Sequence, residues 1–154
     1  ALCFTRQKLP ILDHGEGQPV ADTRKGAYIL AREKGKNTPD IILLGSGSEV
    51  QWLVAARATL QAEGIAARVV SVPSQELFLL QPQAYQDEVL PPSVRTRLAC
   101  EAAASISWYR FTGLDGTVVG LDHFGGSAPA DVLFKEFGFT AENVTNRARA
   151  LLKK

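Results

Sequence analysis

The stretch that decides the fold is Asp122-His123-Phe124-Gly125-Gly126-Ser127-Ala128-Pro129. It follows the apolar run 117–121, which has the composition of a buried strand, and it precedes two helical segments that are separated at Gly138. Open α/β folds place their sites in such loops, because the carboxyl ends of parallel strands meet along one edge of the sheet. The stretch therefore predicts an α/β domain with a candidate site after its last strand.

Strands and helices alternate through the rest of the chain. We expect strands at residues 27–31, 41–44, 67–72, 97–102 and 117–121. We expect helices from Ser46–Ser48 to Gly64, at residues 83–90 and 131–137, and from Thr140 onward. A strand–helix–strand unit of this length is right-handed and has parallel strands. The sequence therefore predicts a three-layer α/β/α domain with about five strands.

Bulk composition limits both the organisation and the function of the chain. Its 154 residues hold about one domain, and the glycine-rich segment 13–26 is typical of a linker between residues 1–12 and a main domain at residues 27–154. A net charge of +1 predicts no general attraction to nucleic acid, and the apolar runs are too short to span a membrane. Cys3 and Cys100 fit no metal or redox spacing, so we expect two free thiols in a reducing cytoplasm.

The loop Gly45-Ser46-Gly47-Ser48 is the first candidate site. It lies between an expected strand and an expected helix, where free backbone N–H groups attract anions. It lacks the third glycine of a dinucleotide-binding loop and the lysine of a P-loop. We therefore expect a tight turn with a capping box, formed by Ser48 with Gln51 or by Ser46 with Glu49. Anion binding by residues 45–48 is the alternative.

The loop after the last strand is the second candidate site. His123 beside Asp122 suggests acid–base chemistry, but no nucleophile with an orienting group is identifiable nearby, and Ser127 would serve only if the fold brought it close. We therefore expect an assembly loop at an interface, made of Asp122, His123, Gly125, Gly126 and Ser127.

Glu101 follows a strand that should be buried, so its carboxylate needs hydrogen bonds or a cation. We expect bonds from loop amides, with an acid of raised pKa as the alternative.

Several segments match those of a known family in order and spacing. The match is carried by Leu2–Gln7 (LCFTRQ), Asp40–Val50 (DIILLGSGSEV), the loop at residues 122–129, and Phe134–Val144 (FKEFGFTAENV). Together these segments resemble the C-terminal domain of transketolases, with the last residues of the domain before it. Thr5, Cys100 and Ala103 depart from the family's usual Ser, Val and Gly, and these are small-for-small changes.

The resemblance implies a mostly parallel sheet of about five strands with one antiparallel strand, and it assigns residues 1–12 to the end of a pyrimidine-binding domain. It implies a cytoplasmic, homodimeric parent enzyme of the pentose phosphate pathway that moves a two-carbon ketol unit from a ketose phosphate to an aldose phosphate. That enzyme would use thiamine diphosphate and a divalent cation, Mg or Ca. By the same resemblance, Arg6 contacts the phosphate of the sugar substrate, and a guanidinium suits this task because it stays charged and binds two oxygens at once.

The diphosphate-binding elements of such enzymes do not occur in this sequence, which contains no Gly-Asp-Gly and no Asn-Asn. We therefore expect the chain itself to hold no cofactor or metal and to serve structure and assembly. Its partners would be the other domains of the parent and a second subunit. One alternative is the C-terminal domain of a related enzyme, deoxyxylulose-phosphate synthase or a 2-oxoacid dehydrogenase subunit. Another is a stand-alone module that binds a nucleotide or regulator through Gly45–Ser48.

Overall fold

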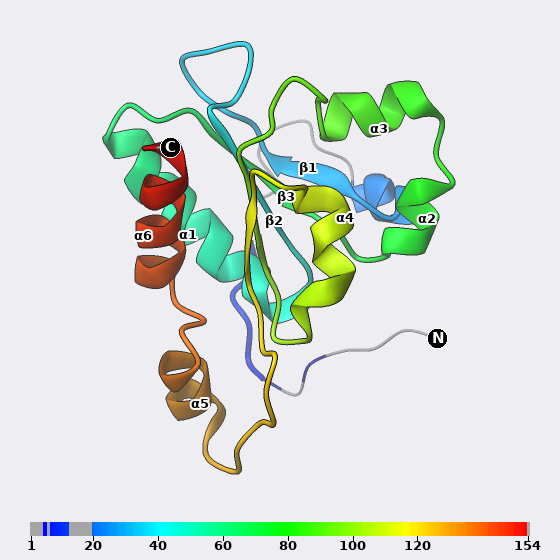
Figure 1. The fold of residues 1–154 in the computed structure, drawn as a ribbon. Helices are drawn as coiled ribbons and strands as arrows, with labels where there is room; N and C mark the ends of the chain where they lie inside the picture. The colour runs from blue at the N-terminus through cyan, green and yellow to red at the C-terminus, as the bar shows by residue number, and fades with distance from the viewer. Residues whose placement is uncertain (1–4, 6, 13–19, 154) are drawn as a thin grey trace.

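The structure is a computed structural model in which residues 5, 7–12 and 20–153 are described (Figure 1). The strands are β1 (Tyr28–Ala31), β2 (Ile41–Gly45), β3 (Ala67–Ser71), β4 (Arg97–Cys100) and β5 (Thr117–Val119). The α-helices are α1 (Val50–Ala62), α2 (Gln75–Leu79), α3 (Gln83–Val89), α4 (Tyr109–Thr112), α5 (Ala130–Glu136) and α6 (Ala141–Leu152). Short 3-10 helices are η1 (Val20–Lys25), η2 (Gly47–Glu49) and η3 (Ser105–Trp108).

The strands of the described chain form one sheet in the order β1-β3-β2-β4-β5. β1 runs antiparallel to β3, whereas β3, β2, β4 and β5 are parallel neighbours. Each strand overlaps the range expected from the sequence. The expected mixed sheet with one antiparallel strand is therefore confirmed.

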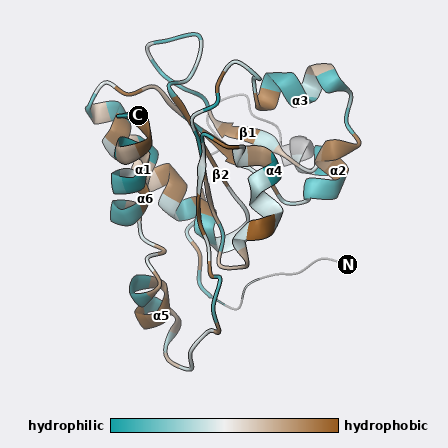
Figure 2. Cartoon of the chain, viewed as in Figure 1, coloured by the Kyte–Doolittle hydropathy of each residue, from teal (hydrophilic) through white to brown (hydrophobic). Residues whose placement is uncertain are grey.

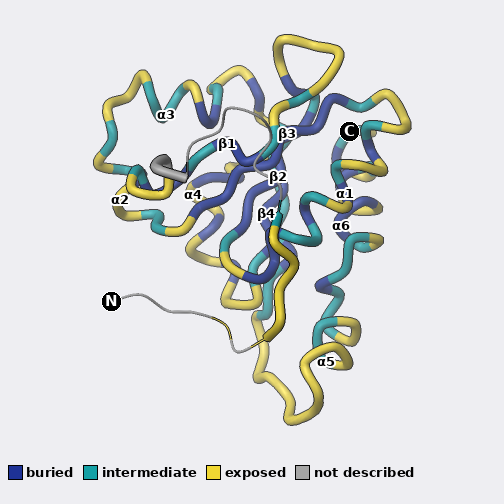
Figure 3. Tube along the Cα trace, turned by 180° about the vertical axis from the view of Figure 1, so that it is seen from behind, coloured by how far each residue is buried: buried dark blue, intermediate teal, exposed yellow. Residues whose placement is uncertain are grey.

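Helices cover both faces of this sheet. Ile41 and Leu43 of β2 belong to the core beneath α1 and α6, whereas Ile42 and Leu44 belong to the core beneath α2, α3 and α4. This alternation follows from the two-residue period of a strand. Figures 2 and 3 show the apolar, buried strands between helices whose outer surfaces are more polar and exposed. The arrangement is the predicted three-layer α/β/α domain.

Two helix boundaries follow the local signals in the sequence. Gly64, just beyond α1, has a φ of +79°, a conformation that glycine adopts without steric cost. Thr140 begins α6, because its Oγ1 accepts a hydrogen bond from the backbone N–H of Asn143 at 3.2 Å. Both boundaries were expected, and the buried pair Phe139 and Val144 flanks the start of α6 as a hydrophobic staple would.

Three short helices differ from the expectation. The sequence did not reveal α2, η3 or α4, which are too short to show helical periodicity, yet they supply buried Phe78, Trp108 and Phe111. Of the expected linker at residues 13–26, residues 13–19 lie outside the described part of the chain, and residues 20–25 form η1. None of the helices in the described part of the chain combines the length and apolarity needed to cross a membrane.

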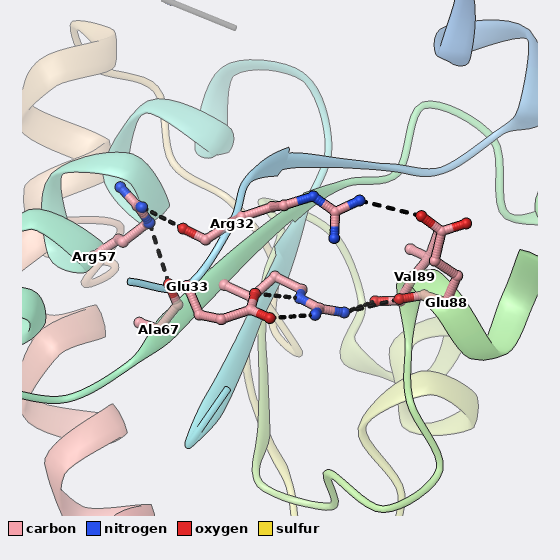
Figure 4. Close-up of polar contacts among 7 residues, drawn as sticks. Arg32, Glu33, Arg57, Ala67, Glu88 and Val89 are labelled. Carbon is pink, nitrogen blue, oxygen red and sulfur yellow. Dashed lines mark hydrogen bonds and ion pairs between the residues drawn. The ribbon is translucent and has the colours of Figure 1, made fainter. Parts of the chain in front are cut away.

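A buried ion pair ties the layers together at the amino end of β3 (Figure 4). Arg68 binds Glu33 through Nη2–Oε1 at 2.6 Å and Nε–Oε2 at 2.8 Å, and the two side chains are only 5% and 6% exposed. Arg68 also donates to the carbonyl oxygens of Glu88 at 2.8 Å and Val89 at 3.1 Å. Burial alone would raise the pKa of Glu33, but the hydrogen bond and charge of Arg68 hold it below the usual value.

Candidate functional site

Three loops meet where the parallel strands β2, β4 and β5 end. These are residues 45–49, 101–104 and 120–129, and we call them the carboxyl edge. The chain passes from β2 through α1 to β3 on one side, whereas β4 lies on the other side of β2. The gap between β2 and β4 is thus the switch point at which open α/β sheets bind ligands.

The first predicted loop begins with a glycine that the packing requires. Gly45 pairs in register with Cys100 at the end of β4. A Cβ at Gly45 would lie 2.8 Å from the carbonyl oxygen of Cys100 and 2.8 Å from Cδ1 of Leu53. Gly47 has a φ of +52°, which lets the chain turn into η2. These contacts bring the loop close to the residue that follows β4.

That residue is Glu101, and it is bonded to the loop. Its Oε2 accepts hydrogen bonds from the backbone N–H of Ser46 at 3.2 Å and from Ser46 Oγ at 2.7 Å. The prediction that Glu101 binds loop amides is therefore confirmed. A second carboxylate, Glu49, is only 4% exposed, and its Oε1 accepts from Ser48 Oγ at 3.0 Å.

The predicted capping boxes are wrong in both registers. Neither Ser46 nor Glu49 caps the following helix with its side chain. The Ser46 and Ser48 hydroxyl groups instead donate to the carboxylates of Glu101 and Glu49. The Gln51 side chain donates to the Ser48 carbonyl oxygen at 2.9 Å. In a capping box it would instead accept a hydrogen bond from the Ser48 backbone N–H. The sequence could not reveal this because Glu101 is remote along the chain.

Two carboxyl groups, those of Glu49 and Glu101, lie close enough at the carboxyl edge to repel each other. Burial raises the pKa of Glu49. Burial raises the pKa of Glu101 as well, and the nearby Glu49 adds to the effect although the Ser46 hydroxyl opposes it. The Cys100 thiol is buried between strands, and burial together with both carboxylates raises its pKa to about 12. Because negative charge already lies against Gly45–Ser48, an external anion would be repelled there; anion binding stays an untested prediction.

The second predicted loop is anchored through Asp122. Its Oδ1 accepts from the Ser105 backbone N–H at 2.8 Å, and its Oδ2 accepts from Ser105 Oγ at 2.7 Å. These two bonds hold the pKa of Asp122 below its usual value. Asp122 thus binds the start of η3.

His123 and Ser127 lie in the part of the loop that carries no visible catalytic arrangement. His123 Nδ1 lies 2.8 Å from the Phe124 carbonyl oxygen, and its ring contacts the Phe137 ring edge-on at 5.1 Å between centroids. Ser127 is exposed, as is every residue from 122 to 132. No described residue is bonded to His123 as a nucleophile, and the expected role of this loop in assembly stays a prediction.

The two glycines of this loop, Gly125 and Gly126, have different surroundings. A Cβ at Gly125 would meet nothing within 4 Å, whereas a Cβ at Gly126 would lie 3.1 Å from Cδ2 of Leu133. Phe124 beside them is fully exposed, at 100%. Figure 1 shows that this loop and α5 extend away from the sheet. The domain itself therefore leaves Gly125 and Phe124 open to contact.

Sequence analysis missed the apolar surface near this loop. Ile106 is 77% exposed, Tyr109 is 53% exposed and Val132 is 52% exposed. Tyr109 differs in this from its neighbours Trp108 and Phe111, which are buried. The one feature of the sequence that pointed to this apolar surface was Phe124, an aromatic residue in a glycine-rich loop.

The remaining predicted site residue, Arg6, lies outside the described part of the chain. Among its neighbours, Gln7 donates its backbone N–H to Thr5 Oγ1 at 3.2 Å. Gln7 and Lys8 also line a cavity of about 530 Å³ against Trp52 of α1 and Phe134 of α5. The segment that precedes the main domain therefore runs beside the helix that follows the assembly loop.

The described residues do not fit a metal–diphosphate group. No cluster of three or more His, Cys, Asp or Glu side chains in this part of the chain could hold a metal ion. The closest arrangement is the pair Glu49 and Glu101, which already accept hydrogen bonds from Ser48 and Ser46. We therefore assign no thiamine diphosphate chemistry to these residues.

Comparisons with known proteins agree with this architecture. The family profile described as "Transketolase-like TK C-terminal domain" matches residues 26–140. The chain is 45% identical over 154 residues to a transketolase of Bacillus subtilis, and 45% identical over 147 residues to one of Aquifex aeolicus. The two matches cover 100% and 96% of this chain, but only 23% and 21% of the two relatives.

Solved structures give the same result. A transketolase from Leishmania mexicana superimposes with a TM-score of 0.80 at 38% identity, covering 90% of this chain and 19% of that one. A mutant transketolase from Pichia stipitis superimposes with a TM-score of 0.83 at 36% identity, covering 96% of this chain and 20% of that one. The chain thus belongs to the transketolase C-terminal domain family, and it spans about a fifth of the length of the transketolases that it matches.

Proposed function

We propose that the chain is the C-terminal part of a transketolase that moves a two-carbon ketol unit from a ketose phosphate to an aldose phosphate. The observation that carries this proposal is the 45% identity to a named transketolase across all 154 residues. The parent would use thiamine diphosphate with Mg or Ca, act in the pentose phosphate pathway in the cytoplasm, and form a homodimer. The related thiamine-diphosphate enzymes and the stand-alone module are less well supported, because the relatives that match over the full chain are named transketolase.

Within that enzyme, we assign this part to assembly rather than to chemistry. Two arrangements support the assignment. The exposed loop at residues 122–129 leaves Phe124 and Gly125 uncovered. The residues Gln7 and Lys8, at the end of the expected pyrimidine-binding domain, run beside α5 just beyond that loop. Other domains of the parent would supply the groups that hold the cofactor.

Substitution of Gly125 in the full-length parent tests this role. Gly125→Leu should leave the melting temperature of the 154-residue chain unchanged, because a side chain there meets nothing within 4 Å. In the full-length enzyme it should weaken the dimer, measured by sedimentation. Ala150→Leu, an equally exposed change on α6, is the control and should leave the dimer intact. A stable Gly125→Leu dimer with abolished turnover would mean that the loop reaches the active site.

Arg6 is proposed to bind the phosphate of the sugar substrate in the parent. A charged hydrogen bond of this kind contributes about 1.5–3 kcal/mol. Arg6→Ala should therefore raise the KM for phosphorylated donors by roughly ten- to a hundredfold, while a non-phosphorylated donor is hardly affected. Lys8→Ala, two residues along, is the control. Equal losses for both kinds of donor in steady-state kinetics would identify Arg6 as a structural residue instead.

A further inference from the structure

A second cavity is lined by residues of α2, α3 and α4. These helices lie on the opposite face of the sheet from α1 and α6 (Figure 1). Its volume is about 420 Å³, which falls in the range of small-molecule sites. Three arginines line it, Arg95, Arg97 and Arg110, together with apolar side chains of Phe78, Phe111 and Leu114. The sequence analysis assigned no role to any of these arginines.

Arg97 places a half-buried positive charge in this cavity. Its guanidinium donates to the carbonyl oxygens of Val94 at 2.8 Å, Phe111 at 2.9 Å, Leu90 at 3.1 Å and Pro91 at 2.9 Å. All these partners are neutral. Burial lowers the pKa of Arg97, and no carboxylate offsets that effect. Buried Arg68, in contrast, has the carboxylate of Glu33 as its partner.

The charges at the rim do not compensate Arg97. Arg95 and Asp115 form an exposed ion pair with each other, Nε–Oδ2 2.6 Å, so their charges cancel. Asp87 accepts from Gln83 at 2.7 Å. Arg110 is exposed on α4, and it makes no hydrogen bond or ion pair with any residue in the described ranges. The cavity is therefore left with two guanidinium groups against one carboxylate.

The lining combines this positive charge with apolar surface. Phe78 and Phe111 are buried with their rings 6.2 Å apart, and Leu114 at the rim is 98% exposed. A phosphate ester carries up to two negative charges. Arg110 can bind two phosphate oxygens at once, and Arg97, four of whose N–H groups donate to carbonyl oxygens, adds positive charge beside it. An aromatic or other apolar body would cover the exposed Leu114 side chain.

We propose that this cavity binds a small organic phosphate with an aromatic or apolar body, whose phosphate lies between Arg97 and Arg110. The site lies on the other face of the sheet from α5 and is independent of the assembly role. Failure of this proposal would leave the transketolase assignment untouched.

The test is a titration of the 154-residue chain with phenyl phosphate, followed by NMR of backbone amides. Inorganic phosphate and phenol are the comparison probes, since each supplies only half of the proposed chemistry. The affinity for phenyl phosphate should be at least about tenfold higher than the affinity for either comparison probe. Binding should shift the amide signals of Gly113 and Leu114. Equal binding of phenyl phosphate and inorganic phosphate, or shifts confined to other regions, would overturn the proposal.

Variants of the rim arginine separate binding from folding. Removal of Arg97 would also free the carbonyl groups that it holds, so Arg110→Gln is the better test. It should weaken phenyl phosphate roughly tenfold without changing the melting temperature. Arg149→Gln removes an exposed arginine of α6 on the opposite face and should leave binding unchanged. Equal losses in the two variants would show nonspecific charge attraction and contradict the proposal.

Discussion

The two ends of the sheet hold buried charge in opposite ways. At the amino end of β3, Glu33 and Arg68 neutralise each other through two hydrogen bonds (Figure 4). At the carboxyl edge, Glu49 and Glu101 are two acids whose charges repel, and each is bonded to a neutral serine hydroxyl. The first arrangement lowers the pKa of its carboxyl group, whereas the second raises the pKa values of both carboxyl groups.

The two pairs differ in what they contribute to the stability of the fold. A paired, fully bonded ion pair fixes the positions of β1, β3 and α3, and its geometry explains why both groups are buried. Two neighbouring like charges at the switch point give the domain no such benefit. We infer that the amino-end pair is structural, and we assign no structural role to the two acids of the carboxyl edge.

Removal of Arg68 is the change with the largest expected effect. Arg68→Met would leave the Glu33 carboxylate buried without its hydrogen-bonded cation, so the free energy of unfolding should fall by about 3–5 kcal/mol. Urea denaturation at pH 7 measures this. The double variant Arg68→Met with Glu33→Leu should recover most of the loss, because it removes the unpaired charge.

An exposed ion pair provides the matched control for this change. Arg149 pairs with Glu63 on the surface, where side chains are 40% and 36% exposed. Arg149→Met should cost only about 0.2–1 kcal/mol. If Arg68→Met and Arg149→Met destabilise the chain equally, then the amino-end pair is not the structural element described here.

Neutralising one acid of the carboxyl edge should have a smaller effect of opposite sign. Glu101→Gln keeps an oxygen that accepts from Ser46 but removes a buried charge and its repulsion with Glu49, so stability at pH 8 should rise by on the order of 0.5 kcal/mol. Because the pKa of Glu101 is raised in the folded state, native protein binds more protons than unfolded protein above the ordinary pKa of 4.5. The cost of the charge is therefore present at neutral pH.

The pH dependence of the free energy of unfolding distinguishes Glu101 from Glu33. The gain in Glu101→Gln should vanish as the pH falls below 4.5, where both folded and unfolded wild-type chains carry the neutral acid. Glu33 should behave in the opposite way, because its pKa is lowered: its stabilising contribution is lost as the pH falls. Denaturation of the wild type and Glu101→Gln between pH 4 and pH 8 measures the slope. A gain that persists at pH 4 would mean that repulsion is not its cause.

The sequence predicted most of the fold because its signals are local. The buried runs of β2 and β3, the glycine after α1 and the threonine before α6 each act within a few residues of the boundary that they set. The short helices α2 and α4 were missed because their positions depend on packing of Phe78 and Phe111 against remote strands.

The candidate site was less predictable for the same reason. Sequence analysis found Glu101, Ser46 and Asp122 separately, and it correctly expected Glu101 to bind a loop. It could not reveal that the loop was residues 45–48, or that Ser46 and Ser48 would bind carboxylates rather than cap a helix. The contact between Ser46 and Glu101 joins residues from different loops, and only the parallel order of β2 and β4 brings them together.

The most direct test of the central claim, that this domain serves assembly rather than cofactor chemistry, is calorimetry of the 154-residue chain with thiamine diphosphate and magnesium. The account predicts no binding that depends on magnesium, because the described residues offer no cluster that could hold a metal ion. Intact folding is checked by circular dichroism of the same sample. Stoichiometric binding in the micromolar range that is lost when magnesium is left out would contradict the account and would place cofactor-binding groups in this part of the chain.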